Sequence, residues 1–141
     1  MKILILCTGN SCRSQMAHGF LASFDNRLHV SSAGTEASGQ LNKRAVEVMH
    51  EIGIDISHHS SDPVDKYLEE DWDYVITVCG GADENCPSFP GKVKHRLHMG
   101  YDDPSHTTGT DAHIRSEFIR VRDEIKSGFY KLYGQKIKPA L

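Results

Sequence analysis

A cysteine and an arginine with five residues between them stand near the start of the chain, where Cys7 and Arg13 bracket a short polar stretch. The stretch follows the apolar run 3–6 and precedes residues with helical spacing of apolar side chains. A loop in that position can turn backbone N–H groups toward an anion, and the dipole of the next helix favours the same charge. The guanidinium of Arg13 can bind a tetrahedral oxyanion through paired hydrogen bonds. We therefore predict an oxyanion-binding loop made of Thr8, Gly9, Asn10, Ser11, Cys12, Arg13 and Ser14, with Cys7 as its nucleophile.

The same surroundings bear on the reactivity of Cys7. A helix N-terminus and a nearby arginine lower the pKa of a thiol, so we expect a Cys7 thiolate at neutral pH. The alternative is a buried, inert cysteine with a surface arginine close by, since the spacing alone is common. The position between a strand and a helix, with Gly9 to allow a tight turn, favours the catalytic interpretation. The loop lacks the lysine of a nucleotide-binding P-loop.

Length and composition are typical of one globular domain, residues 1–141. The formal net charge of −3 and the absence of a basic stripe give no indication of a nucleic-acid partner. Neither a signal peptide nor an apolar stretch of membrane-spanning length is evident. We expect a cytoplasmic protein without a membrane partner, and a monomer.

Four cysteines are present, Cys7, Cys12, Cys79 and Cys86. In a reducing cytosol, such cysteines are more often catalytic, redox-active or metal-bound than joined in structural disulfides. Their spacings do not form the paired CxxC knuckles of a structural zinc site, so we predict no metal site.

Strand-like and helix-like segments alternate along the chain. We predict strands over residues 2–7, 28–33, 74–78 and 93–97. Helices are expected over residues 14–24, 41–52 and 62–70, followed by a long helix that Thr110 caps and that extends to Leu132. This alternation indicates an α/β fold with a single open sheet of about four parallel strands flanked by helices. Ligands of such sheets bind at the carboxyl ends of the strands, where Cys7 would lie.

The loop resembles the phosphate-binding loop of low-molecular-weight protein tyrosine phosphatases, and most closely that of the thioredoxin-coupled arsenate reductases built on this fold. The resemblance extends through residues 32–35, the Cys79 to Cys86 segment, Asp102-Asp103-Pro104 and residues 118–125. It implies that Asp103 is the general acid, with Asp102 as the second candidate. Glutaredoxin-coupled relatives also exist, and the spacing of Cys79 and Cys86 only favours thioredoxin.

The resemblance further implies a thiol relay. Cys79 would attack the adduct of Cys7 with arsenic, releasing arsenite and leaving a Cys7–Cys79 disulfide. Cys86 would then move the disulfide to Cys79–Cys86, where thioredoxin reduces it. A helix over residues 79–86 would separate the two Cα atoms by about 10 Å, whereas a disulfide needs about 4.4–6.8 Å. We therefore expect residues 79–90 to act as a mobile redox switch.

Two other functions remain open. A phosphatase would use the same nucleophile on phosphotyrosine or small phosphate esters and would need no further thiol. Tyrosines usually follow the Asp-Pro pair in that family, whereas Ser105, His106, Thr107 and Thr108 do so here. A redox sensor would use only the Cys79–Cys86 couple.

Some arsenate reductases of this kind bind potassium near the loop. Asn10, Ser32 and Asp62 match that set, but His18 stands where the resemblance would place a glutamate. An imidazole is a poor ligand for a hard cation that prefers oxygen. We expect no bound cofactor, with thioredoxin as external reductant, and we regard potassium dependence as doubtful.

Overall fold

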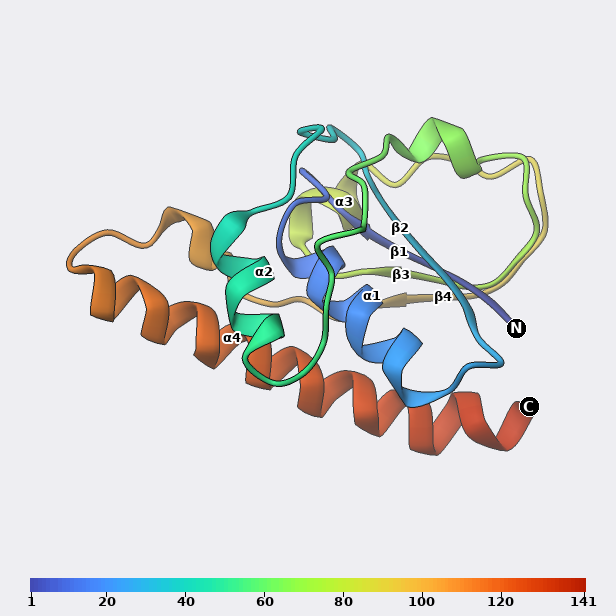
Figure 1. Cartoon of the computed structure of the whole chain (residues 1–141). Coiled ribbons are helices and arrows are strands. Elements are labelled where there is room, and N and C mark those ends of the chain that lie inside the picture. Colours follow the sequence, from blue (N-terminus) through green and yellow to red (C-terminus); the bar gives the residue numbers. More distant parts are fainter.

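The computed structural model describes residues 1–141 and contains one sheet of four parallel strands (Figure 1). The strands are β1 (Lys2–Cys7), β2 (His29–Gly34), β3 (Trp72–Thr77) and β4 (Val93–His98), in the spatial order β2-β1-β3-β4. Residues 3–6 of the central strand β1 are fully buried, which explains their unbroken apolar run. Because all four strands are parallel, the segments that follow Cys7, Thr77 and His98 leave the sheet at the same edge.

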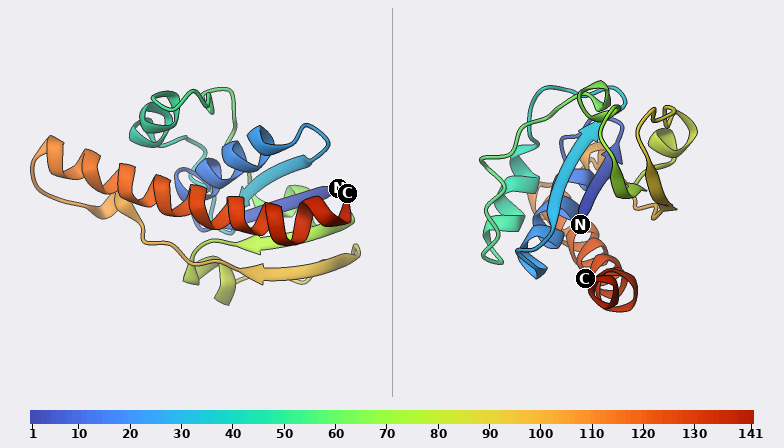
Figure 2. Two further views of the ribbon diagram at one scale, coloured as in Figure 1. Left: turned by 90° about the horizontal axis from the view of Figure 1, so that it is seen from below. Right: turned by 90° about the vertical axis from the view of Figure 1, so that its right-hand side faces the viewer.

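The helices are α1 (Arg13–Phe24), α2 (Lys43–His50), α3 (Gly80–Glu84) and α4 (Asp111–Leu132). α1 packs against α4, and α2 contacts both of them. In the right-hand view of Figure 2, α2 and α3 lie on opposite sides of the strands. Short 3₁₀ turns at Val64–Tyr67 (η1) and Pro104–His106 (η2) complete the loops. α4 continues into a π-helical turn, Tyr133–Ile137 (η3), and a final 3₁₀ turn, Lys138–Ala140 (η4).

One core lies between the sheet and the α1–α4 pair. Its largest fully buried side chains include Phe20 of α1 and both Phe118 and Phe129 of α4. Burial of an aromatic side chain of this size contributes about 1.5–3 kcal/mol relative to exposure. The core thus fixes the start of α1, and with it Arg13, relative to β1.

The predicted fold class is confirmed, and each predicted strand overlaps an observed one. Two helical segments differ from the prediction. The helix expected over 62–70 is only η1, because the Asp62 carboxylate accepts a hydrogen bond from the Ser60 hydroxyl and does not cap the turn. α2 begins at Lys43 because the Asn42 side chain caps it, accepting hydrogen bonds from two backbone N–H groups. No helix combines the length and apolarity needed to cross a membrane.

Candidate active site

A cavity of about 370 Å³ opens at the carboxyl edge of the sheet, beside the loop that joins β1 to α1. Cys7 forms its base and is almost completely buried. Its lining from the predicted loop consists of Thr8, Gly9, Ser11, Cys12 and Arg13, and the opposite wall consists of Asp103, Ser105 and His106. Residues that are far apart in the sequence therefore surround the thiol of Cys7.

Buried polar contacts hold the catalytic loop (residues 7–14) in shape. Asn10 is fully buried and has a positive φ of 49°, a conformation that asparagine tolerates better than most residues. Its amide nitrogen donates to the Ser14 hydroxyl (2.8 Å), and its amide oxygen accepts from the backbone N–H of Asp62 (2.9 Å). The side chain of Gln15 donates to the Asn10 carbonyl oxygen (3.0 Å). Asn10 and Ser14 thus fix the loop and do not line the cavity.

Arg13 is oriented by two contacts with the wall opposite the loop. One terminal nitrogen donates to the carbonyl oxygen of Tyr101 (3.0 Å), and the other lies 3.4 Å from the Asp103 carboxylate. The Nε atom of Arg13 is buried and has no hydrogen-bond partner in the protein. An unpaired buried donor is costly, and an oxyanion bound in the cavity would satisfy it.

Asp103 lies at the cavity and Asp102 does not. One oxygen of Asp103 accepts from the N–H and hydroxyl of Ser105, and the other lies near Arg13 and 3.3 Å from Nε2 of His106. Burial raises the pKa of this carboxyl, but the Ser105 hydrogen bonds and the neighbouring Arg13 and His106 side chains outweigh that effect, so the pKa lies below its usual value. Asp102 pairs instead with Arg120 (3.2 Å) on the outside of α4.

Cys79, the residue that caps α3, lies beside the start of the catalytic loop. Its sulfur contacts the Thr8 hydroxyl (3.3 Å) and accepts from the N–H of Ala82 (3.4 Å), and it is close enough to the Cys7 thiol for the two to influence each other's pKa. These contacts, with that of Cys7 first, lower the pKa of Cys79. The neighbouring Cys79 thiol, and then burial, raise the pKa of Cys7 against the opposing charge of Arg13. The two thiols titrate as a pair, and their pKa values move in opposite directions.

The close approach of Cys79 depends on a glycine. A Cβ atom built at Gly81 would lie 2.8 Å from the Thr8 hydroxyl oxygen, which is too close for an ordinary contact. Gly81 thus allows the first turn of α3 to lie against the catalytic loop.

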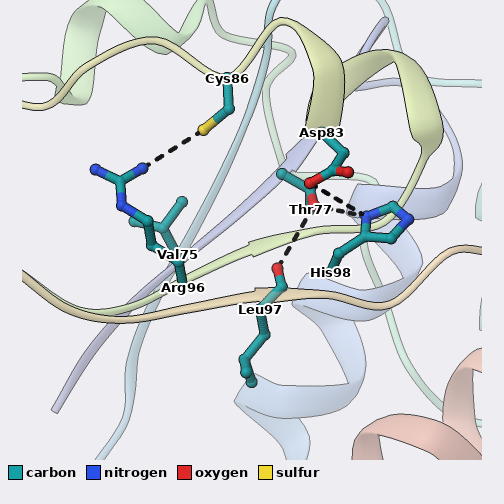
Figure 3. A pocket seen from close by; sticks show the side chains of 7 residues that line it. All are labelled: Val75, Thr77, Asp83, Cys86, Arg96, Leu97 and His98. Atoms are coloured by element: carbon teal, nitrogen blue, oxygen red, sulfur yellow. Dashed lines mark hydrogen bonds and ion pairs between the residues drawn. The ribbon is translucent and has the colours of Figure 1, made fainter.

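Cys86 and Cys12 are placed differently. The sulfur of Cys86 lies in a second cavity near β4, where Arg96 donates to it (3.7 Å; Figure 3). All four cysteines are free thiols. Burial, and secondarily the charge of Asp103, raise the pKa of Cys12 to about 12, so this wall of the cavity stays uncharged.

The residues that match a potassium site do not form an oxygen cage. Nδ1 of His18 is hydrogen-bonded to the Ser32 hydroxyl (3.0 Å), and its ring stacks on His59 with a centroid distance of 4.0 Å. Burial, reinforced by the neighbouring histidines, lowers the pKa of His18 to about 3, so the ring is neutral. The Asp62 carboxylate is paired with Lys66 (3.6 Å). A hard cation prefers several oxygen ligands, and this arrangement does not fit one.

Three contributors were not predicted as part of the site: Gln15, His106 and the Tyr101 carbonyl oxygen. Gln15 joins the loop to residues 59–60, since its amide also contacts His59 and the Ser60 carbonyl oxygen. The position of Gln15, two residues after Arg13 at the start of a helix that packs on the sheet, could have identified it. A fully buried polar side chain there is normally hydrogen-bonded. No sequence pattern indicates that a backbone carbonyl oxygen binds Arg13.

Comparison with known proteins agrees with this geometry. The chain is 50% identical over 137 residues to an arsenate reductase of Bacillus licheniformis, covering 96% of this chain and 91% of that protein. Two solved structures, an arsenate reductase in the phosphate binding state and one in the oxidized state, superpose with a TM-score of 0.76 each. Their sequence identities are 30% and 31%, and each comparison covers 95% of this chain and 97% of the other. The model of the low molecular weight phosphotyrosine protein phosphatase family matches residues 2–140, and the chain therefore belongs to that family.

Proposed function

We propose that this protein is an enzyme that reduces arsenate to arsenite through a relay of Cys7, Cys79 and Cys86, and that thioredoxin reduces the final disulfide. The observation that carries the proposal is the position of Cys79, whose sulfur lies 3.3 Å from the hydroxyl of Thr8, the residue that follows Cys7 in the lining of the oxyanion cavity. Hydrolysis of a phosphate ester needs one thiol, whereas a two-electron reduction needs a second thiol within reach of the first. The relatives at about 50% identity that are named arsenate reductase support the same choice.

The first step forms a bond between Cys7 and arsenic. Transfer of the Cys7 proton to the neighbouring Cys79 thiolate would generate the nucleophile, and release of that proton to solvent would restore the Cys79 thiolate for the second step. The loop amides and Arg13 would hold the oxyanion, as preorganised donors do in other anion sites. Once Arg13 turns from Asp103 to the substrate, the Asp103 carboxyl loses a stabilising cation and its pKa rises. Asp103 can then carry the proton that the leaving hydroxyl takes up.

The second step transfers the electrons. The Cys79 thiolate attacks the sulfur of Cys7, and the sulfur–arsenic bond breaks with its electron pair remaining on arsenic. Arsenic is reduced from the +5 to the +3 state, and the two sulfurs are oxidised to the Cys7–Cys79 disulfide. Cys86 then attacks Cys79, so that Cys7 leaves as a thiolate and is restored for the next cycle.

The proposal includes the reducing cytosol as the site of action, since the relay must begin with free thiols. It also includes independence from potassium, because His18 is a neutral partner of Ser32. Replacement of potassium by choline at constant ionic strength should change turnover less than twofold. A large loss that potassium alone restores would contradict this part.

The test is arsenate-dependent NADPH oxidation with thioredoxin and thioredoxin reductase. Sustained turnover should disappear in the Cys7→Ser, Cys79→Ser and Cys86→Ser variants. Rapid quench distinguishes them, because Cys86→Ser should still release one arsenite per chain and accumulate the Cys7–Cys79 disulfide. The other two variants should release none. Turnover only with glutathione and glutaredoxin would change the reductant, and turnover with neither would overturn the proposal.

Hydrolysis of phosphate monoesters is the second candidate, and the family match favours it. The cavity lining contains no phenylalanine, tyrosine or tryptophan, and it has no aromatic wall to receive a phosphotyrosine ring. We therefore expect slow hydrolysis of small aryl phosphates that is lost in Cys7→Ser and retained in Cys86→Ser. Rapid hydrolysis without arsenate turnover would move this function to first place.

A further inference from the structure

Cys86 lies in a cavity of its own, separate from the oxyanion cavity. This second cavity, of about 340 Å³, lies between β4 and the segment that follows α3 (Figure 3). Its charged and polar lining includes Asp83, Arg96 and His98 beside Cys86. The catalytic steps proposed above use only Cys86 from this group, so the role of its neighbours is open.

Arg96, on strand β4, is held against the Cys86 segment by two contacts. A terminal nitrogen donates to the Cys86 sulfur at 3.7 Å. The guanidinium carbon lies 5.3 Å from the ring centroid of Phe89, three residues further along the same segment. Phe89 is only 9% exposed and is one of the few buried residues there. The planar guanidinium suits both contacts, since it stacks on aromatic rings and donates along its edge.

Two other ionisable groups, Asp83 and His98, line the cavity around Cys86. Asp83, from α3, is the nearby anion that disfavours a Cys86 thiolate. Its carboxylate lies 3.9 Å from Nδ1 of His98, which is also hydrogen-bonded to the Thr77 hydroxyl (2.7 Å). Arg96 is thus the one permanent cation in contact with the thiol.

We propose that Arg96 is the positioning residue of the resolving thiol. It holds the Cys86 sulfur in place and increases the fraction of Cys86 that is present as a thiolate when the Cys7–Cys79 disulfide forms. This inference rests on the proposed relay and deepens it. When the disulfide is in place, the Cys86 thiolate attacks the sulfur of Cys79. The Cys86–Cys79 bond forms, the Cys79–Cys7 bond breaks, and its electron pair leaves with Cys7 as a thiolate.

The electrostatics of the pocket agree with this role. Burial raises the pKa of Cys86 above its ordinary value, and the charge and hydrogen bond of Arg96 are the principal effects that oppose it. Loss of that cation would raise the pKa further, by about one unit if the pair contributes as much as a typical charge-assisted contact. Fewer Cys86 thiolates would then be present at neutral pH.

The test follows each cysteine of the full-length reduced protein by iodoacetamide labelling and peptide mass spectrometry between pH 6 and pH 11. In Arg96→Met, the midpoint of Cys86 labelling should move up by about one pH unit, and Arg96→Lys should move it less. Lys94→Met is the matched control. It removes a cation from the same strand, but one that pairs with Asp73, and should leave the midpoint unchanged.

The rate of the resolving step gives a second, independent readout. Thiolates of higher pKa are better nucleophiles, with a Brønsted coefficient of about 0.4–0.5. A tenfold loss of thiolate is therefore partly offset, and Arg96→Met should form the Cys79–Cys86 disulfide about threefold more slowly at pH 7. Above both midpoints, the variant should be at least as fast as the wild type. A purely structural role would slow the step at every pH.

The outcomes separate this inference from the relay itself. If Cys86→Ser abolishes sustained turnover but Arg96→Met labels and reacts like the wild type, the relay stands and the role of Arg96 is refuted. If Cys86→Ser sustains turnover, the relay fails whatever Arg96 does. A variant that slows equally at pH 7 and pH 10 also refutes the inference, with melting temperature as the check on folding.

Discussion

The catalytic loop and the redox segment (residues 79–90) meet at Cys79 but are held very differently. The loop is tied to distant backbone by Asn10 and Gln15, and its carbonyl oxygens at Cys7 and Thr8 accept from Thr35 and Glu36. In the redox segment, between Gly80 and Pro90, only Ala82 and Phe89 are buried. The loop is preorganised to bind one geometry of anion, whereas the segment has few contacts to lose.

The difference follows from what each region has to do. An oxyanion site is effective when its donors need no rearrangement during the reaction. The relay instead requires Cys79 to face Cys7 first and Cys86 later, and its second disulfide needs a Cα separation of about 4.4–6.8 Å. A five-residue helix, α3, is cheap to unwind because short helices are marginal on their own. Substitutions in the catalytic loop should therefore reduce the rate of arsenate reduction strongly. Substitutions in the redox segment should change only the steps that follow arsenite release.

The largest effect on turnover is expected from a substitution of Asp103, which lies across the cavity from the catalytic loop. Asp103→Asn should lower kcat for arsenate by about 10²–10⁴, the usual contribution of a positioned general acid. Asp102→Asn is the matched control and should stay within a few-fold of wild type, because Asp102 contacts Arg120 outside the cavity. Steady-state turnover with thioredoxin measures both. Equal losses in the two variants would show that Asp103 acts through the shape of its loop and not through its proton.

A smaller effect is expected on the folding stability at low pH, where the buried His18 behind the catalytic loop would have to take up a proton. His18 has a folded-state pKa of about 3, while an unfolded histidine has a pKa of about 6.5. Between these two pKa values, the unfolded state binds more protons than the folded state. The contribution of His18 to the free energy of unfolding is therefore fully present above pH 6.5 and decreases as the pH falls toward 3. Between pH 7 and pH 5, this one residue should cost on the order of 1–2 kcal/mol.

Urea unfolding at the two pH values measures this loss, and His18→Asn should reduce it. The redox segment contains no histidine, so the exchange rates of its amide protons, corrected for intrinsic pH dependence, should not follow the same curve. An identical pH dependence of stability in His18→Asn and the wild type would show that other groups titrate instead.

How far the sequence could predict the site depended on how local each feature is. The placement of Cys7 and Arg13 in one cavity was predictable because strand, loop and helix follow one another directly. The influence of Cys79 on the pKa of Cys7 could not be predicted, since Cys79 follows β3 and the spacing of the loop does not indicate that the two thiols are neighbours. The choice between Asp102 and Asp103 needed the path of the chain, because adjacent side chains point in different directions. Arg96 could not be predicted as a partner of Cys86, because parallel pairing of β3 and β4 brings it there.

The smallest effect is expected from a substitution in α3, which tests whether the redox segment moves independently of the catalytic loop. Gly80 begins α3, and a Cβ atom added there meets nothing within 4 Å. Gly80→Ala should therefore stabilise the helical form of α3 by about 0.4–1 kcal/mol, chiefly because alanine has less conformational entropy than glycine when the helix is unwound. Formation of the Cys79–Cys86 disulfide should slow by about two- to fivefold, since it requires unwinding.

Arsenite release in a single turnover precedes that unwinding and should keep its rate in Gly80→Ala. Gly134→Ala is the control, because it makes the same change in η3, also in open space, far along the chain from any thiol. Quenched-flow measurement of both steps separates the two regions within one experiment. If Gly80→Ala slows arsenite release as well, the redox segment already moves while Cys79 attacks, and the two regions act as one.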